Sequence, residues 1–135
     1  HLRGGDYLRE DIKDFFGGIC TKDYYKNAIE YVNAKTDNRA KFFLFTNDSS
    51  YAKGFSDSLG IDYQIIDWNR GDDDYIDMQL MSCCKHNIIA NSTFSWWGAY
   101  LNRNNSKIVV APSRWCNSEY LQKDIIPDGW HKIEV

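Results

Sequence analysis

The chain has 135 residues, of which 43% are hydrophobic and 26% are charged, and 16 Lys and Arg against 19 Asp and Glu give a net charge of −3. This balance excludes a wholly disordered chain, and the length predicts a single domain over residues 1–135. A mildly acidic chain without a long basic run is a poor nucleic-acid binder. No stretch approaches the roughly 18 consecutive apolar residues of a membrane span. Because the first residue is His1, we expect a longer protein of which this chain is one part.

Hydrophobic periodicity predicts helices and strands that alternate along the chain. Thr21 is placed as an N-cap, and Tyr25, Ile29 and Val32 follow it at the spacing of one helix face. The apolar run 42–45 predicts a buried strand. The later predicted elements are a helix over 49–59 ended by Gly60, a strand over 63–66, a helix opening at 72–74 with Ile76, Leu80 and Cys83 on one stripe, a strand over 86–90, a helix over 93–102, a strand over 108–110, a weak helix over 118–123 and an extended tail over 130–135.

Such alternation predicts an α/β fold, namely a Rossmann-like parallel sheet with helices on both faces. In such sheets, ligands bind at the carboxyl ends of the strands and at the helix N-termini that follow them. We therefore expect four segments to share one rim of the sheet: residues 1–7, 46–50, 91–95 and 111–115.

The first rim segment carries a guanidinium, two glycines and a carboxylate. Arg3 could bind a phosphate through two parallel hydrogen bonds, and the glycines would allow close backbone approach. Asp6 could orient Arg3 or act as a base. The alternative is a surface turn in which Arg3 and Asp6 merely form an ion pair.

The third rim segment places Asn91, Ser92, Thr93 and Ser95 between a strand and the start of a helix. Their hydroxyls and the unpaired backbone N–H groups of a first helical turn predict an anion site. Plain N-capping by Ser92 or Thr93 is the alternative, and both interpretations can hold together. The tryptophans that follow, at positions 96 and 97, are expected in the core because they lie inside the helix.

Cysteine spacing and acidic residues give no metal-site signal. Cys20, Cys83, Cys84 and Cys116 form no CxxC pair, so we expect reduced thiols and a cytoplasmic protein, or one bound peripherally at the inner face of the membrane. The run Asp72–Asp74 resembles the metal-binding DxD of a different transferase fold. We interpret it as acidic residues at a helix N-terminus, and expect no metal and no cofactor.

Three blocks of sequence together resemble a known family. They are His-x-Arg-x-Gly-Asp-Tyr at 1–7, HNIIANSTFSWWGAYLN at 86–102 and KIVVAPSRW at 107–115, and residues 20–25, 43–51 and 124–128 fit the same pattern. They resemble the α-1,2-fucosyltransferase family (glycosyltransferase family eleven). The resemblance implies the carboxyl-terminal, donor-binding half of a GT-B-like enzyme, with the acceptor-binding half before His1. Such an enzyme moves fucose from GDP-fucose to a galactose 2-hydroxyl of a glycan acceptor, with inversion and without a metal.

The same resemblance implies roles for individual residues. Arg3 would hold the donor pyrophosphate, and Ser95 with backbone groups of Thr93 or Phe94 would complete the cradle near Asn91. A carboxylate, either Asp48 or Asp77, would accept from the guanine N1 and N2 groups. The guanine base itself would lie near His86 or Asn87, or near Asp48. The local candidates for the catalytic base that deprotonates the acceptor are His1 and Asp6.

Two positions depart from the family pattern. Gly4 stands where the family usually has a second arginine, and Tyr51 where it tends to have Trp. The missing cation favours one alternative, a non-catalytic α/β nucleotide-binding or interaction module, and a transferase that uses another nucleotide-sugar is a second. We expect the chain alone to bind GDP weakly and to transfer nothing. Self-association is expected through the apolar face that the other half would cover.

Overall fold

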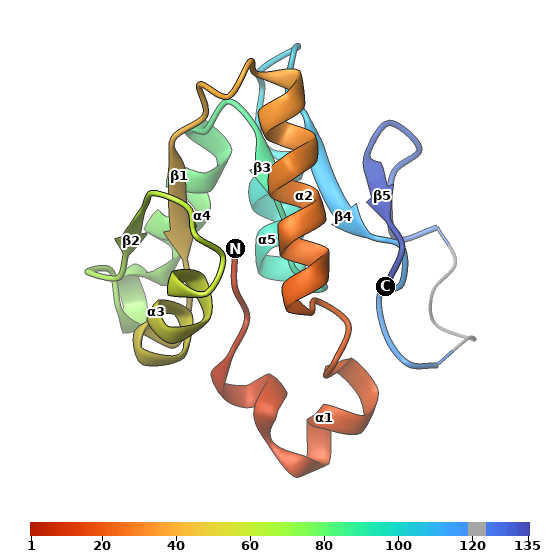
Figure 1. Cartoon of the computed structure of the whole chain (residues 1–135). Coiled ribbons are helices and arrows are strands. Elements are labelled where there is room, and N and C mark those ends of the chain that lie inside the picture. Colours follow the sequence, from red (N-terminus) through yellow and green to blue (C-terminus); the bar gives the residue numbers. More distant parts are fainter. Residues whose placement is uncertain (119–123) are drawn as a thin grey trace.

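The computed structural model describes residues 1–118 and 124–135, apart from the side chains of Asp6 and Leu8 (Figure 1). The weak helix predicted over 118–123 therefore falls almost entirely outside the described residues. The fold is α/β, as predicted, with α2 and α3 in front of the strands and α4 and α5 behind them (Figure 1).

All strand pairs in the described chain are parallel, which confirms the predicted parallel pairing. The pairs form two small sheets rather than one. In the first, β1 (Phe42–Phe45) pairs with β2 (Tyr63–Ile66). In the second, the order is β3 (Asn87–Ile88), β4 (Val109–Pro112) and β5 (His131–Ile133). The predicted extended tail is thus a sheet strand, whereas β3 is shorter than the predicted 86–90.

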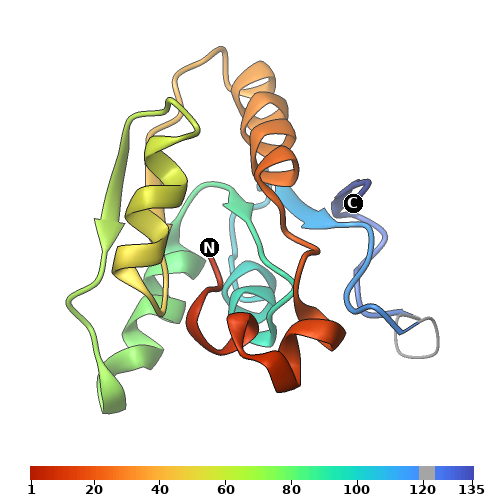
Figure 2. The ribbon, with the colours of Figure 1, turned by 60° about the horizontal axis from the view of Figure 1, so that its bottom comes forward.

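The start of the chain lies between the two sheets. Leu2 forms a parallel bridge with Thr46, and its N–H donates to the Phe45 carbonyl at 2.9 Å. The amino group of His1 donates to the Ile88 carbonyl at 2.8 Å. Figures 1 and 2 both show this terminus between β1 and β3. Residues 1 and 2 therefore link the sheets through backbone hydrogen bonds.

The helices follow from their capping residues and apolar spacing. Thr21 accepts from the Tyr24 N–H at 3.3 Å, and Tyr25, Ile29 and Val32 are buried beneath the helix that follows, as predicted. Asp48 caps the next helix by accepting from the Tyr51 N–H at 3.0 Å. The elements are η1 (Gly5–Leu8), α1 (Glu10–Phe16), α2 (Lys22–Lys35), α3 (Ser49–Asp57), η2 (Gly71–Asp73), α4 (Asp74–Cys83) and α5 (Thr93–Tyr100).

The predicted buried stripe of α4 was wrong. The buried residues are Asp77 and Met81, whereas Leu80 is 37% exposed and Cys83 is exposed. The reason is helix–helix packing, because α4 lies against α5 and Met81 sits over Gly98. A Cβ at Gly98 would lie 2.9 Å from the Met81 Cβ, so the missing side chain permits the close approach.

Two other burial predictions also differ from the structure. Strand β1 is not buried throughout, since Phe43 is 48% exposed while Phe45 is buried. Trp96 packs on the core formed by Ile89 and Trp130, as expected, but Trp97 is 46% exposed. No helix in the described part of the chain is long and apolar enough to cross a membrane.

Candidate functional site

The four predicted rim segments do meet at the carboxyl ends of the strands. Gly4 donates its N–H to Asn47 Oδ1 at 3.1 Å, which joins the first segment to the second. The Tyr7 hydroxyl donates to the Asn91 carbonyl at 2.9 Å, which joins the first to the third. The Asn91 amide donates to the Trp115 carbonyl at 3.0 Å, which joins the third to the fourth. Figure 2 shows this rim facing the viewer, with η1 and α1 beside it.

Asn91 holds the rim together through its side chain. The amide also donates to the Phe16 carbonyl at 3.0 Å, and its oxygen accepts from the Cys20 thiol at 3.4 Å. The side chain is only 2% exposed. Buried amides are retained where their hydrogen bonds are satisfied, so Asn91 acts as a structural hub for the loops. Its predicted contact with a donor stays a prediction.

Arg3 sits on the same rim, half-buried, with its guanidinium over the ring of Tyr7. The Arg3 Cζ lies 5.4 Å from the ring centroid, the distance of a cation–π contact. Tyr7 in turn stacks on Phe16, with ring centroids 5.5 Å apart. Tyr7 thus supports Arg3 and reaches the 91–95 loop through its hydroxyl. No role was predicted for Tyr7 from the sequence, although this aromatic residue lies within the motif that carried the resemblance.

Ser95 is placed differently from the expected phosphate ligand. Its side chain is fully buried, and its hydroxyl donates to the Ala90 carbonyl at 3.2 Å and the Ser92 carbonyl at 3.1 Å. Thr93 is exposed at the first position of α5, and Ser92 precedes the helix without a side-chain cap. An anion that approaches this loop would meet Thr93 and the first backbone N–H groups before the Ser95 hydroxyl.

The candidates for the base lie in different surroundings. His1 is 8% exposed, its ring centroid lies 5.8 Å from that of Phe94, and its carbonyl accepts from the Tyr25 hydroxyl at 2.7 Å. Its Nδ1 is buried without a hydrogen-bond partner in the described chain. Asp6 lies within η1 on the rim, and its side chain is not described.

His86 and Asn87 are not brought to the rim. They lie at the amino end of β3, the opposite edge of the sheet. His86 Nδ1 accepts from the Ile108 N–H at 3.1 Å. The Asn87 amide donates to the Met81 carbonyl at 2.8 Å and accepts from Asn102 at 2.8 Å. Both side chains therefore connect secondary-structure elements away from Arg3.

The two guanine-binding candidates are carboxylates after β1 and β2. Asp48 caps α3 on the rim. Asp77 lies on α4, 8% exposed, and accepts from the Asn69 amide. Burial raises the pKa of the Asp77 carboxyl, the Asn69 hydrogen bond opposes that rise, and the nearby Asp74 carboxylate adds to it. Within the described residues no three His, Cys, Asp or Glu side chains cluster as metal ligands, and Asp73 is the N-cap of α4.

Comparison with known proteins gives the family. The model of glycosyl transferase family 11 matches residues 1–134. The chain belongs to this family. The resemblance stated from the motifs is therefore confirmed.

Curated relatives agree with this membership. The chain is 36% identical to an α-1,2-colitosyltransferase of Escherichia coli, over 99% of its own length and 46% of the relative's. It is 37% identical to the O-antigen biosynthesis glycosyltransferase WbnK of Escherichia coli, over 96% and 42%. It is 26% identical to the human galactoside α-(1,2)-fucosyltransferase 1, over 90% and 33%. The chain thus spans less than half the length of these relatives, and no solved structure matches it significantly.

Replacing Asn91 by Ala in this family 11 chain tests its role as the hub. The change leaves the Phe16 and Trp115 carbonyls without their donor, so we expect a loss of roughly 2–4 kcal/mol in the free energy of unfolding. Urea unfolding measures it. Asn105→Ala, at an exposed asparagine, is the matched control and should change little. An equal loss in both variants would contradict the hub.

The two departures from the family pattern contact each other. A Cβ at Gly4 would lie 2.7 Å from Cδ1 and 3.2 Å from Cγ of Tyr51. The Tyr51 ring therefore covers the place from which a side chain at position 4 would project. Such closeness requires a residue without a side chain beneath the ring.

This contact predicts coupling between the two positions. We expect Gly4→Ala to destabilise the chain by about 1–3 kcal/mol, because the ring cannot remain where it is. In a Tyr51→Ala background the ring is absent, so adding Gly4→Ala there should cost little further stability. A thermal double-mutant cycle measures the coupling, and simple additivity would argue against the contact.

Asp77 predicts a pH-dependent stability. Its folded-state pKa is raised, so the neutral carboxyl favours folding below the ordinary value of about 4, and this contribution is lost as the pH rises through the folded-state pKa. Asp77→Asn keeps an oxygen for Asn69 and removes the buried charge. We expect it to raise the melting temperature at pH 7 and to lose that advantage toward pH 3. The exposed Asp14→Asn is the control, and a gain that is independent of pH would contradict the explanation.

Proposed function

We propose that this chain is the donor-binding part of an α-1,2-glycosyltransferase that takes GDP-fucose and transfers fucose to the 2-hydroxyl of a galactose in a glycan. The proposal includes inversion at the anomeric carbon and no metal. The observation that supports it is the meeting of Arg3 with the 91–95 loop on one rim of a family 11 chain, linked by Tyr7.

The charge on this rim suits the proposed chemistry. Departure of GDP leaves negative charge on the diphosphate while the sugar becomes cationic. Arg3 and the first backbone N–H groups of α5 would stabilise that charge where it develops. The Arg3 guanidinium is already oriented by the Tyr7 ring, so little reorganisation is needed on binding.

Because residue 4 is a glycine, the first rim segment contributes to the site through its backbone at this position. The backbone of Gly4 is fixed by Asn47, and the Tyr51 ring covers it. We propose that Arg3 supplies the side-chain positive charge of this motif and that Tyr51 forms part of the wall of the site. Of the two bases within the motif, the burial of His1 beside Phe94 favours Asp6.

A second donor deserves a direct comparison. One relative at 36% identity is named for colitosyl transfer, which supports a colitose nucleotide as the alternative to GDP-fucose. Transfer from each donor by the full-length protein to a galactose-terminated acceptor separates the two.

The other partner predicted from the sequence, a second copy of the chain, stays a prediction. Exposed Trp68, Tyr75, Trp97 and Tyr100 are consistent with it.

Binding of GDP to the chain tests the site. We expect Arg3→Ala to weaken GDP binding by about tenfold to a hundredfold, because a charge-assisted pair with the diphosphate is lost. Isothermal titration with GDP, UDP and ADP measures affinity and base preference together. Arg39→Ala is the matched control, since its side chain is 81% exposed. Unchanged GDP binding in Arg3→Ala, or a preference for UDP or ADP, would contradict the proposal.

A further inference from the structure

The first two residues have the hydrogen bonds of a strand in the middle of a sheet. Successive N–H groups along a strand point to opposite sides. The Leu2 N–H donates to β1 at Phe45, and the His1 nitrogen donates to β3 at Ile88 on the other side. The bridge to Thr46 is parallel, as are all other pairs in the described chain.

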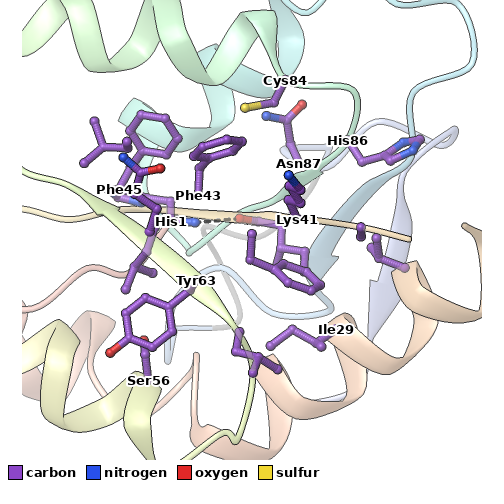
Figure 3. Close-up of a pocket in the computed structure, with 18 of the residues that line it drawn as sticks. His1, Ile29, Lys41, Phe43, Phe45, Ser56, Tyr63, Cys84, His86 and Asn87 are labelled. Atoms are coloured by element: carbon purple, nitrogen blue, oxygen red, sulfur yellow. Dashed lines mark hydrogen bonds between the residues drawn. The ribbon is translucent and has the colours of Figure 1, made fainter. Parts of the chain in front are cut away.

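A slot continues from His1 toward the amino ends of β1 and β3. Strand β1 is paired with β2 along one edge and β3 with β4 along one edge, so the two edges that face each other carry no strand among the described residues. A cavity of about 970 Å³ lies between them and reaches from His1 to Lys41 and His86 (Figure 3). Neither Arg3 nor Ser95 lines this cavity, and among the described residues of the rim segments only His1 and Leu2 reach it.

The lining of the slot is mainly apolar, although Arg39, Lys41 and Lys85 also contribute to it. The α2 side presents Ile29 and Val32, and the α4 side presents Leu80 and Cys84. A strand between them would bury successive side chains against opposite helices. Strands covered on both faces are apolar at every position, because neither side meets water.

The His1 amino group is poorly placed for a charge. It is buried, and burial lowers its pKa to about 6. The bond that it makes is one that a neutral peptide N–H makes equally well. A peptide bond at this nitrogen would therefore keep the bond to Ile88 and remove the cost of burying a cation.

We infer that the slot between β1 and β3 holds a parallel β-strand of about four residues that immediately precedes His1 in the same polypeptide. This strand joins the two sheets into one, in the order β2, β1, the added strand, β3, β4, β5. The parallel register set by Leu2 and Thr46 places the residue directly before His1 opposite Leu44. The third residue before His1 then lies opposite Phe42. The strand leads directly into Arg3, so its pairing fixes where the rim site begins.

Extending the chain tests the strand. One variant carries Ile-Val-Val-Val directly before His1, and its matched control carries Ile-Val-Pro-Val, in which proline removes a ladder N–H. Hydrogen exchange followed by mass spectrometry reports on 42–45 and 87–88. We expect at least tenfold slower exchange there and a melting temperature about 5 °C higher for the first variant than for the control.

Three results would overturn the inference. The first is equal exchange and stability in both extensions. The second is protection that depends on protein concentration, because the added residues would then pair between molecules. The third has two parts: GDP added to the 135-residue chain slows exchange over 42–45 and 87–88, and neither extension changes exchange there. The slot would then be a ligand cavity. None of these results depends on whether the rim transfers fucose.

Discussion

The backbone hydrogen bonds of His1 and Leu2 are the constraint on which the remainder of the structure depends. They join a sheet of two strands to a sheet of three, and they set the point at which the chain turns onto the rim. Because backbone groups buried between strands must be paired, this link is strongly specified by the strands on either side. Arg3 follows one residue later, so the pairing of the strands sets the point from which its side chain extends.

The rim is then fixed by buried polar side chains rather than by apolar packing. Asn91 binds the end of α1 and the loop after β4, Tyr7 binds Asn91, and Asn47 holds Gly4. Loops at strand ends expose many backbone groups, and side-chain amides satisfy several of them at once. The result is a set of loops held in register by hydrogen bonds within the protein. Such preorganisation is what charge stabilisation in a transfer reaction requires.

The local structure explains why residue 4 is a glycine. The Tyr51 ring lies where a side chain at position 4 would start, so the residues at these two positions constrain each other. The motif thereby contributes one guanidinium, and that guanidinium is oriented by Tyr7. The family 11 model matches residues 1–134 of a chain with this arrangement.

Local signals in the sequence determined much of the fold. The Thr21 cap and the spacing of Tyr25, Ile29 and Val32 specify α2, because both act within a few residues. The alternation of elements determined parallel pairing and hence the meeting of the four rim segments. His86 lies at the start of a predicted strand, and this position alone places it at the edge opposite the rim. The donor-binding role that the resemblance implied for His86 conflicts with this placement.

Only the tertiary structure decided which faces are buried and where hydroxyl and amide groups point. The buried face of α4 depends on Gly98 of α5, a residue distant in sequence. The Ser95 hydroxyl turns inward because carbonyls of the preceding loop lie within reach. Asn91 became a hub because α1 and the loop after β4 converge on it. These outcomes depend on contacts between distant segments, which periodicity and turn propensity do not encode.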